Sequence, residues 1–306
     1  MSRMPVPPFP RPHRPLRYAA GAFSPPWGST GATAGALTLV VCLLLAAGCV
    51  PEETGDRAAP ERPLAERLAE ARLVELTHPL NDETIVWPTS DPFEFEILFH
   101  GWTDDGYYYS ARNLAGPEHG GTHLDAPIHF AEGRWTTGEI PLSRLMGPAA
   151  VVDVSEQAAA DPNYQVTAAD LQAWEEVHGP IPDGAFLLLF TDRSRYWGDA
   201  EAYMGTARQD EGAVAELEFP GLHPDAARWL VDNRSVSAVG LDTPSIDHGP
   251  STEFMSHRIL FEENVFALEN VANLDELPAT GAVIIAFPML LEEGTGGPIR
   301  IVAVVE

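Results

Sequence analysis

The chain contains no lysine, so all 18 of its basic residues are Arg, against 45 Asp and Glu, and its formal net charge is −27. A surface this acidic repels phosphate backbones and argues against a nucleic-acid partner. Acidic residues are in turn missing before Glu52, so residues 1–48 carry +4 and residues 49–306 carry −31. This uneven charge predicts two parts with different fates.

Cysteine is almost absent, since only Cys42 and Cys49 occur. Neither lies in the body of the chain, which excludes disulfides and thiol chemistry there. Long hydrophobic runs are also missing. Residues 36–48 form an uncharged apolar run of 13, too short for a membrane-spanning helix, which needs about 20 residues.

That apolar run has the length of a signal-peptide core and follows a basic, acid-free leader. It ends in Leu45-Ala46-Ala47-Gly48-Cys49, which resembles a bacterial lipobox, where the Cys becomes the first mature residue and is lipid-modified. The sequence therefore predicts a lipoprotein signal peptide over residues 1–48 and an exported protein, anchored by lipid in the bacterial cell envelope at a periplasmic or surface face. The alternative is an uncleaved N-terminal anchor, which also places the body outside the cytoplasm.

Residues 49–72 are predicted to be a tether and a short helix, because 50–63 are rich in Pro, Glu, Ala and Gly and 64–72 are helix-forming. Residues 73–306 then form one domain. Short apolar runs rich in β-branched residues or Phe predict strands at 149–154, 186–191, 237–241, 282–287 and 299–305. A capping box at Thr167 predicts a helix to about Val177, and His223-Pro224-Asp225 opens another to about Asn233.

Histidines and an aspartate gather in the segment His119-Gly-Gly-Thr-His123-Leu-Asp125-Ala-Pro-Ile-His129. Extended backbone would place positions 123, 125, 127 and 129 on one face, about 6.6 Å apart per pair. His123 and Asp125 could then bind one ion. A straight strand would hold His119 too far away, but Gly120-Gly121 allows a sharp bend with positive φ that folds it back.

Asp and neutral His are ordinary ligands of Zn²⁺ and Mn²⁺. A hydrolase needs a Lewis acid, an activated water and a proton shuttle. His129, held beyond the ion by Pro127, could remove a proton during attack and return it to the leaving nitrogen. The cluster therefore predicts metal-assisted hydrolysis.

Residues 119–130 resemble the His-x-Gly-Thr-His-x-Asp-x-Pro-x-His-Phe signature of the cyclase family of metal-dependent hydrolases, which contains bacterial kynurenine formamidase and isatin hydrolase. Residues 241–247 and 257–271 resemble two further blocks of that family. By position, the resemblance implies that His119, His123 and Asp125 are metal ligands and that His129 is the catalytic proton carrier.

The resemblance also implies that His257 and Glu269 complete a two-ion site, with one or two ions of Zn or Mn as cofactor. One ion is the alternative, because residues 219–230 resemble isatin hydrolase, which uses a single manganese. His248 competes with His257 as the distal ligand. Trp87 falls where formamidases place an aromatic residue against the substrate, and core packing is its alternative role.

The implied fold is α/β, a swivelling β/β/α domain with a mixed sheet and few helices, assembled as a homodimer or homotetramer. The implied enzyme is a metal-dependent hydrolase of C–N bonds other than peptide bonds, acting on a small aryl formamide, amide or lactam. Two alternatives stay open. The same site could serve a lactonase or a cyclase-type dehydratase, or the chain could be a metal- or ligand-binding lipoprotein without catalysis.

Overall fold

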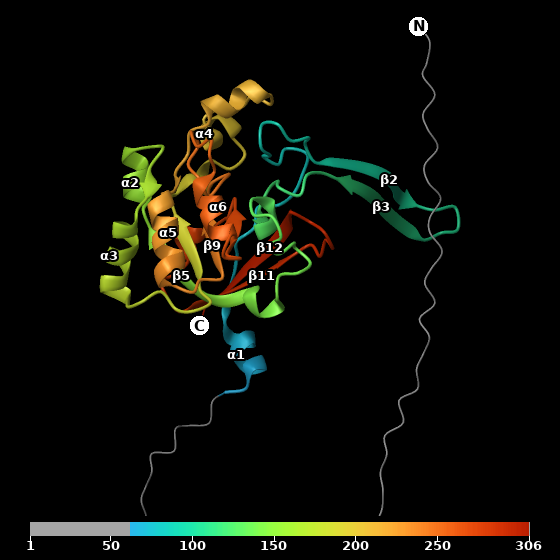
Figure 1. Ribbon diagram of the computed structural model, residues 1–306. Coiled ribbons are helices and arrows are strands. Elements are labelled where there is room, and N and C mark those ends of the chain that lie inside the picture. The colour runs from blue at the N-terminus through green and yellow to red at the C-terminus, as the bar shows by residue number, and fades with distance from the viewer. Residues whose placement is uncertain (1–61, 306) are drawn as a thin grey trace, which may run out of the picture. The chain divides into compact units, whose positions relative to one another are not determined.

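A ring of seven strands forms the centre of residues 62–305, the part of the chain that the computed structural model describes (Figure 1). Neighbours run in the order β12-β11-β5-β7-β9-β10-β4, and the ring closes because β4 pairs with both β10 and β12. β1 extends the sheet along the other end of β12. The strands are β1 Arg72–Glu75, β4 His123–Asp125, β5 Met146–Asp153, β7 Phe186–Phe190, β9 Ala238–Leu241, β10 Phe266–Glu269, β11 Ala282–Pro288 and β12 Gly296–Val305.

All five predicted strands are confirmed within a few residues, as β5, β7, β9, β11 and β12. The predicted mixed α/β fold with few helices is confirmed as well. The helices are α1 Leu64–Glu70, α2 Ser155–Ala160, α3 Ala168–His178, α4 Ala200–Met204, α5 Pro224–Asn233 and α6 Met255–Phe261. Short 3₁₀ helices lie at Pro127–His129, Leu142–Arg144, Arg193–Tyr196, Glu211–Glu216 and Leu274–Glu276.

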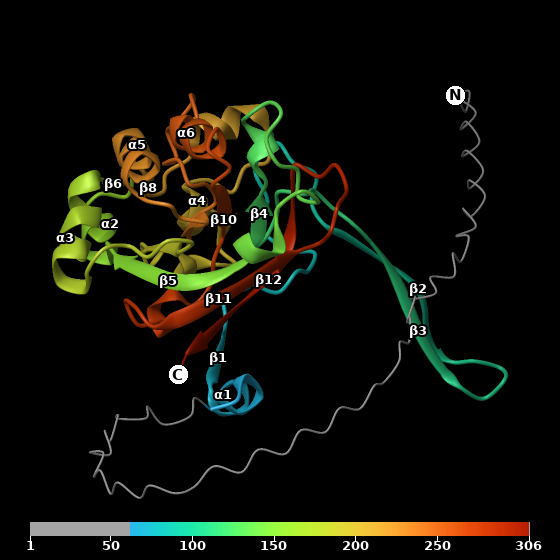
Figure 2. The same cartoon turned by 60° about the horizontal axis from the view of Figure 1, so that its bottom comes forward.

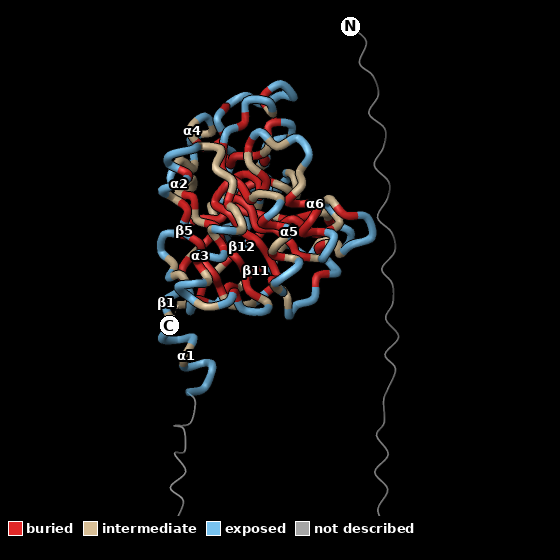
Figure 3. Tube along the Cα trace, turned by 60° about the vertical axis from the view of Figure 1, so that its left-hand side comes forward, coloured by how far each residue is buried: buried red, intermediate tan, exposed pale blue. Residues whose placement is uncertain are grey.

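The parallel strands β5, β7, β9 and β10 are buried on both faces, which is why their sequences are continuously apolar. On the outer face, Leu187 and Leu189 of β7 belong to a core that includes side chains of α3, α5 and α6. On the inner face, Phe186 and Leu188 belong to a second core inside the ring, with Leu124 of β4. Figure 3 shows the buried residues concentrated in the middle of the body and the exposed ones around it.

Local sequence signals place the two long helices. Thr167 Oγ1 accepts a hydrogen bond from the Asp170 amide, and Asp170 Oδ2 accepts one from the Thr167 amide, so the predicted capping box is confirmed at the start of α3. Pro224 takes the first position of α5, where its missing N–H is no loss. Both helices therefore begin where the sequence predicts.

A two-stranded ribbon projects from this body (Figure 2). It consists of β2 Glu94–Trp102 and β3 Tyr108–Ala115. A second pair, β6 Gln165–Val166 with β8 Gly221–Leu222, ties the start of α3 to the start of α5.

The predicted signal peptide 1–48, Cys49 and most of the tether lie outside the described residues. Within residues 62–305, every helix is too short or too polar to cross a bilayer.

Ring closure depends on Leu124, which is fully buried between its paired strands β10 and β12. We expect Leu124→Ala to lower the free energy of unfolding by about 2–5 kcal/mol, because the lost methyl groups leave a cavity in the inner core. Urea unfolding followed by circular dichroism measures this. Leu142→Ala, at a side chain that is 70% exposed, is the matched control and should change stability little. Equal effects would contradict the role of β4 in closing the ring.

Candidate metal centre

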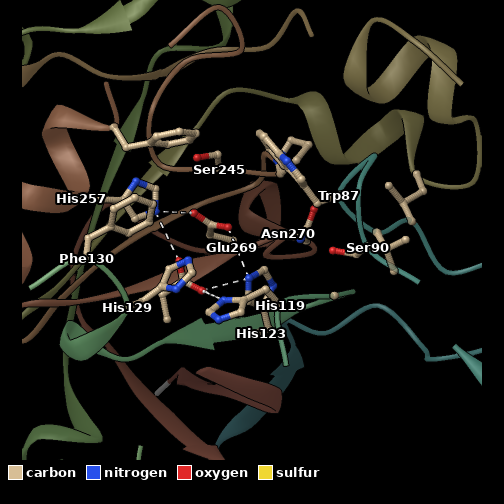
Figure 4. A pocket seen from close by; sticks show the side chains of 16 residues that line it. Trp87, Ser90, His119, His123, His129, Phe130, Ser245, His257, Glu269 and Asn270 are labelled. Atoms are coloured by element: carbon tan, nitrogen blue, oxygen red, sulfur yellow. Dashed lines mark hydrogen bonds and ion pairs between the residues drawn. The ribbon is translucent and has the colours of Figure 1, made fainter. Parts of the chain in front are cut away.

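The predicted site residues of the body all line one cavity of about 250 Å³ (Figure 4). They are Trp87, His119, His123, Asp125, His129, His257 and Glu269. Segments far apart in the sequence therefore meet at one pocket, which has a polar floor and apolar walls.

Four side chains form the floor of the pocket. His123 and Asp125 point the same way from β4, and the antiparallel register places Glu269 of β10 directly opposite His123. His123 Nε2 lies 3.0 Å from Asp125 Oδ1 and 3.3 Å from Glu269 Oε2.

The fourth side chain, His257, enters the floor from α6. Its Nε2 lies 3.1 Å from Glu269 Oε1 and 3.3 Å from Asp125 Oδ2. Each carboxylate thus contacts both imidazoles, and all four residues are at most 5% exposed.

The second nitrogen of each ring has its own acceptor. His123 Nδ1 lies 2.9 Å from the Gly121 carbonyl, and His257 Nδ1 lies 2.7 Å from Asp247 Oδ2. Each Nδ1 therefore donates a proton, and in the neutral ring Nε2 presents a lone pair to the carboxylates. His123 Nε2 is buried and makes no hydrogen bond of acceptable geometry. Lone pairs facing carboxylate oxygens need a positive charge between them.

The raised pKa values of His123 and His257 show the same preference of this centre for positive charge. Burial lowers the pKa of His123, but Asp125 and Glu269 outweigh burial and raise it to about 10. Burial likewise lowers the pKa of His257, while its contacts with Asp125, Asp247 and Glu269 raise it well above the ordinary value. Nitrogen and oxygen donors around such a concentration of negative charge fit a divalent cation, which would take the place of these protons.

His119 returns to the same centre through the predicted bend. Gly121 has a φ of +61°, a backbone conformation that would be strained for a residue with a side chain, and a Cβ there would also lie 2.5 Å from Leu80 Cδ2. The bend brings His119 Nδ1 to 2.6 Å from Asp125 Oδ1. The imidazoles of His119 and His123 outweigh burial, which raises the pKa of Asp125, and hold that pKa well below its usual range.

A relay on the other side of His119 fixes its tautomer. Glu118 Oε2 accepts hydrogen bonds from the amide and the hydroxyl of Thr295, at 2.8 and 2.7 Å. Because the Thr295 hydroxyl proton is committed to Glu118, Thr295 Oγ1 must accept from His119 Nε2, 2.9 Å away. With the Nε2 proton donated to Thr295, the proton that Nδ1 shares with Asp125 is the one that a cation would replace, and Nδ1 would then present its lone pair to that cation.

The predicted extended backbone from 123 to 129 is wrong beyond Asp125. Pro127 begins a 3₁₀ turn in which the His129 amide donates to the Ala126 carbonyl at 2.9 Å. Proline's fixed φ and missing N–H suit the first position of such a turn. The turn stacks the His129 ring on His119, with centroids 3.9 Å apart and planes 22° from parallel. Burial lowers the pKa of His129 to about 4, so this ring is neutral at neutral pH.

Aromatic side chains wall the pocket above the floor. Trp87 packs tilted against Phe254, with ring centroids 6.4 Å apart, and edge-on against Phe219 at 6.5 Å. Phe130 continues the wall from Phe254 to His257. Trp87 therefore lines the cavity and packs on the core beneath it, so both of its predicted roles are compatible with its position.

Sequence reasoning missed the residues that orient the histidines. Asp247 accepts hydrogen bonds from His257 Nδ1 and from the amides of Ser256 and His257. Asp247 had a signal, since it ends the 241–247 block. Thr295 and Glu118 carry no such signal, because they bind each other across 177 positions of the sequence. Among the described residues that line the pocket, His257 is present and its competitor His248 is not.

Comparisons with known proteins find similar chains and a similar fold. Residues 74–248 match the Cyclase family. Isatin hydrolase of Roseibium aggregatum is 36% identical over 212 residues, 67% of this chain and 78% of that protein. Kynurenine formamidase of Bacillus anthracis is 26% identical over 76% of this chain and 97% of that protein. The solved structure of isatin hydrolase A from Ralstonia solanacearum superposes with a TM-score of 0.73 at 32% identity, covering 81% of this chain and all of that one.

The relay to His119 can be tested with Thr295→Val, which keeps the side-chain shape but removes the acceptor for His119 Nε2. His119 can then carry its proton on Nδ1, toward Asp125. We expect the affinity for Zn²⁺ or Mn²⁺ to fall about 10- to 100-fold, as for other residues that orient ligands. Competition with a chromogenic chelator measures this directly. Thr295→Ser keeps the hydroxyl and should retain the affinity, and equal binding by all three proteins would refute the relay.

Proposed function

The chain belongs to the cyclase family, and from this membership and the pocket we propose that it is a metal-dependent amidohydrolase that cleaves a small aryl formamide, amide or lactam. The relatives support this proposal through their names, isatin hydrolase and kynurenine formamidase, since both act on C–N bonds next to an aromatic ring. Zn²⁺ and Mn²⁺ both suit the donor set of imidazole nitrogens and carboxylate oxygens.

One observation carries the proposal: a neutral histidine lies beside a complete set of metal-binding side chains. His123, Asp125, His257 and Glu269 contact one another without His129. His129 instead stacks on His119 at the edge of the same cavity. His129 could also join His119 and Asp125 around a cation, since donor atoms of these three residues lie within 4.8 Å of one another, but an imidazole outside the contacts of the four-residue floor supplies the proton carrier that hydrolysis needs.

The chain's own residues suit the steps of amide hydrolysis. A bound divalent cation supplies a Lewis acid and lowers the pKa of water. Neutral His129 accepts the proton released as water attacks the carbonyl carbon, and then donates it to the leaving nitrogen. The stack on His119 and the edge contact with Phe130, whose centroid lies 4.5 Å away, hold the His129 ring in place for both transfers.

The walls of the pocket favour an aromatic substrate. Trp87, Phe130 and Phe254 present apolar ring surfaces on the side of the cavity away from the carboxylates. A flat aryl group would stack against these rings while its carbonyl faces the polar floor. A cavity of about 250 Å³ has room for a bicyclic molecule.

The proton carrier is tested with His129→Ala. Removing its imidazole should reduce kcat for an aryl formamide or for isatin by about 10²- to 10⁴-fold, the usual contribution of general acid–base catalysis. Metal content, measured by plasma mass spectrometry, should persist, because the floor keeps its four donors.

The control for that variant is His178→Ala, since His178 is exposed and packs on Trp174 in α3, away from the pocket. It should leave both measurements unchanged. Full activity of His129→Ala on a substrate that the wild type hydrolyses would disprove the assigned role. Cleavage of aryl lactones alone would replace the amidohydrolase by a lactonase.

We also propose that the enzyme is exported and lipid-anchored through Cys49, the first residue after the apolar run 36–48. Two acyl signals would hold it stably at a membrane.

In bacterial cells, Cys49→Ser should move the protein from the membrane fraction to the soluble fraction or leave an unprocessed precursor, and abolish incorporation of labelled palmitate. Cys42→Ser, inside the apolar run, should change neither. Palmitate incorporation that persists in Cys49→Ser would contradict the lipid anchor.

A further inference from the structure

The Gly121 carbonyl has to keep one direction for the metal centre to form. It accepts the proton of His123 Nδ1 at 2.9 Å. If the peptide after Gly121 turned over, His123 could carry its proton on Nε2, which would then have no lone pair for a cation. Glycine restricts its own backbone less than any other residue. Another part of the chain must therefore hold this carbonyl in place.

The carboxamide of Asn270 reaches the same carbonyl. Asn270 directly follows Glu269 and lines the pocket (Figure 4), and its Nδ2 lies 2.7 Å from the Gly121 oxygen. A carbonyl oxygen only accepts, so the amide nitrogen, and not Oδ1, must face Gly121. The Gly121 carbonyl thus accepts from Asn270 Nδ2 and His123 Nδ1 together, which occupies both of its lone pairs.

Tyr203 of α4 fixes the other end of this carboxamide. Its hydroxyl lies 2.9 Å from Asn270 Oδ1 and 3.2 Å from the Asp242 carbonyl. Burial raises the pKa of Tyr203 well above its usual value, so the hydroxyl keeps its proton and donates it. The ring is fully buried and packs edge-on against Trp197, with centroids 5.3 Å apart. Tyr203 therefore stabilises the amide orientation that places Nδ2 toward Gly121.

The backbone of Asn270 binds the same segment a second time. Its φ of +54° lies in the left-handed region, which Asn tolerates better than most residues. Its carbonyl accepts from Thr122 Oγ1 at 2.6 Å, and its amide donates to the Thr243 carbonyl at 2.9 Å. Two consecutive residues, Gly121 and Thr122, are thus bonded to one residue at the end of β10. Asn270 ties the bend before His123 to the strand that carries Glu269.

We propose that Asn270 is a positioning residue of the metal centre. Its carboxamide, oriented by Tyr203, holds the Gly121 carbonyl as the acceptor of the His123 Nδ1 proton. His123 Nε2 then keeps its lone pair for a divalent cation, as in metal sites where an outer partner fixes the tautomer of a histidine ligand. This role presupposes the metal dependence proposed above, but it does not depend on which substrate is cleaved.

Asn270→Gly removes the carboxamide and keeps a residue that adopts positive φ without strain. We expect the affinity of the full chain for Zn²⁺ to fall about 10- to 100-fold, measured by competition with a chromogenic chelator. Asn273→Gly is the matched control, because Asn273 also has a left-handed backbone, with φ +52°, and its Nδ2 donates to the Glu75 carbonyl at 2.8 Å on the surface. The control should bind Zn²⁺ like the wild type, and circular dichroism should show that all variants are folded.

Nuclear magnetic resonance of the zinc-loaded full chain, labelled with ¹⁵N in histidine, separates positioning from a merely structural role. The Nδ1 proton of His123 is identified by the absence of its signal from His123→Gln. In Asn270→Gly this proton should exchange faster with water or leave Nδ1, because its acceptor is no longer fixed. In Asn273→Gly the signal should match that of the wild type.

Tyr203→Phe tests whether the tyrosine acts through the carboxamide. Without the hydroxyl, the affinity for Zn²⁺ should fall about 2- to 10-fold, the contribution of one hydrogen bond. The same substitution should have no further effect in Asn270→Gly, since the group through which it acts is already gone. Tyr196→Phe is the control, because the Tyr196 hydroxyl accepts from Arg195 near the surface, and it should bind Zn²⁺ normally.

Three results would overturn the role of Asn270: wild-type zinc affinity in Asn270→Gly, an unchanged His123 signal, or additive losses in the double variant. If these losses occur but the wild type hydrolyses no aryl amide, the positioning role stands and the proposed hydrolase does not. A wild type without measurable affinity for Zn²⁺ or Mn²⁺ would refute the metal dependence, and the positioning role with it.

Discussion

The buried contact between two carboxylates and two imidazoles governs the rest of this structure. Asp125 and Glu269 each lie within 3.3 Å of both His123 Nε2 and His257 Nε2. Burying charge is costly unless it is compensated, so this arrangement is stable only with protons or a cation among its atoms. The centre thus selects positive charge before any substrate enters, and Asp247 and the Gly121 carbonyl direct the lone pairs that would bind it.

The sheet closes at the strand that carries two of these four side chains. β4 is only three residues long, yet it joins β10 on one side and β12 on the other. His123 and Asp125 lie at its two ends with Leu124 between them, pointing into the inner core. The strand that closes the ring therefore also carries two of the four donors. Backbone hydrogen bonds on both edges hold β4 in place. They therefore also fix the positions of His123 and Asp125 relative to Glu269.

The sequence was informative where the determinants are local. Short apolar runs, a capping box and a glycine that permits positive φ predicted five strands, the start of α3 and the bend before His123. The sequence did not predict features whose conformation or role depends on residues far away in the chain. The turn at Pro127 was read as extended strand, because alternation along a short segment does not distinguish the two. Thr295 carries no recognisable signal, since its role depends on Glu118 lying beside it in the folded ring.

The β2–β3 ribbon and the metal centre are joined by one short connection, residues 116–119. β3 ends at Ala115, and His119 follows four residues later. Phe93, which precedes β2, packs so closely on this connection that a Cβ on Gly116 would lie 2.1 Å from its ring, and one on Gly120 2.9 Å. Such packing leaves the connection little room to move. The base of the ribbon and the His119 bend are therefore packed against the same side chain, so the ribbon leaves the body directly beside the segment that carries His119 to Asp125.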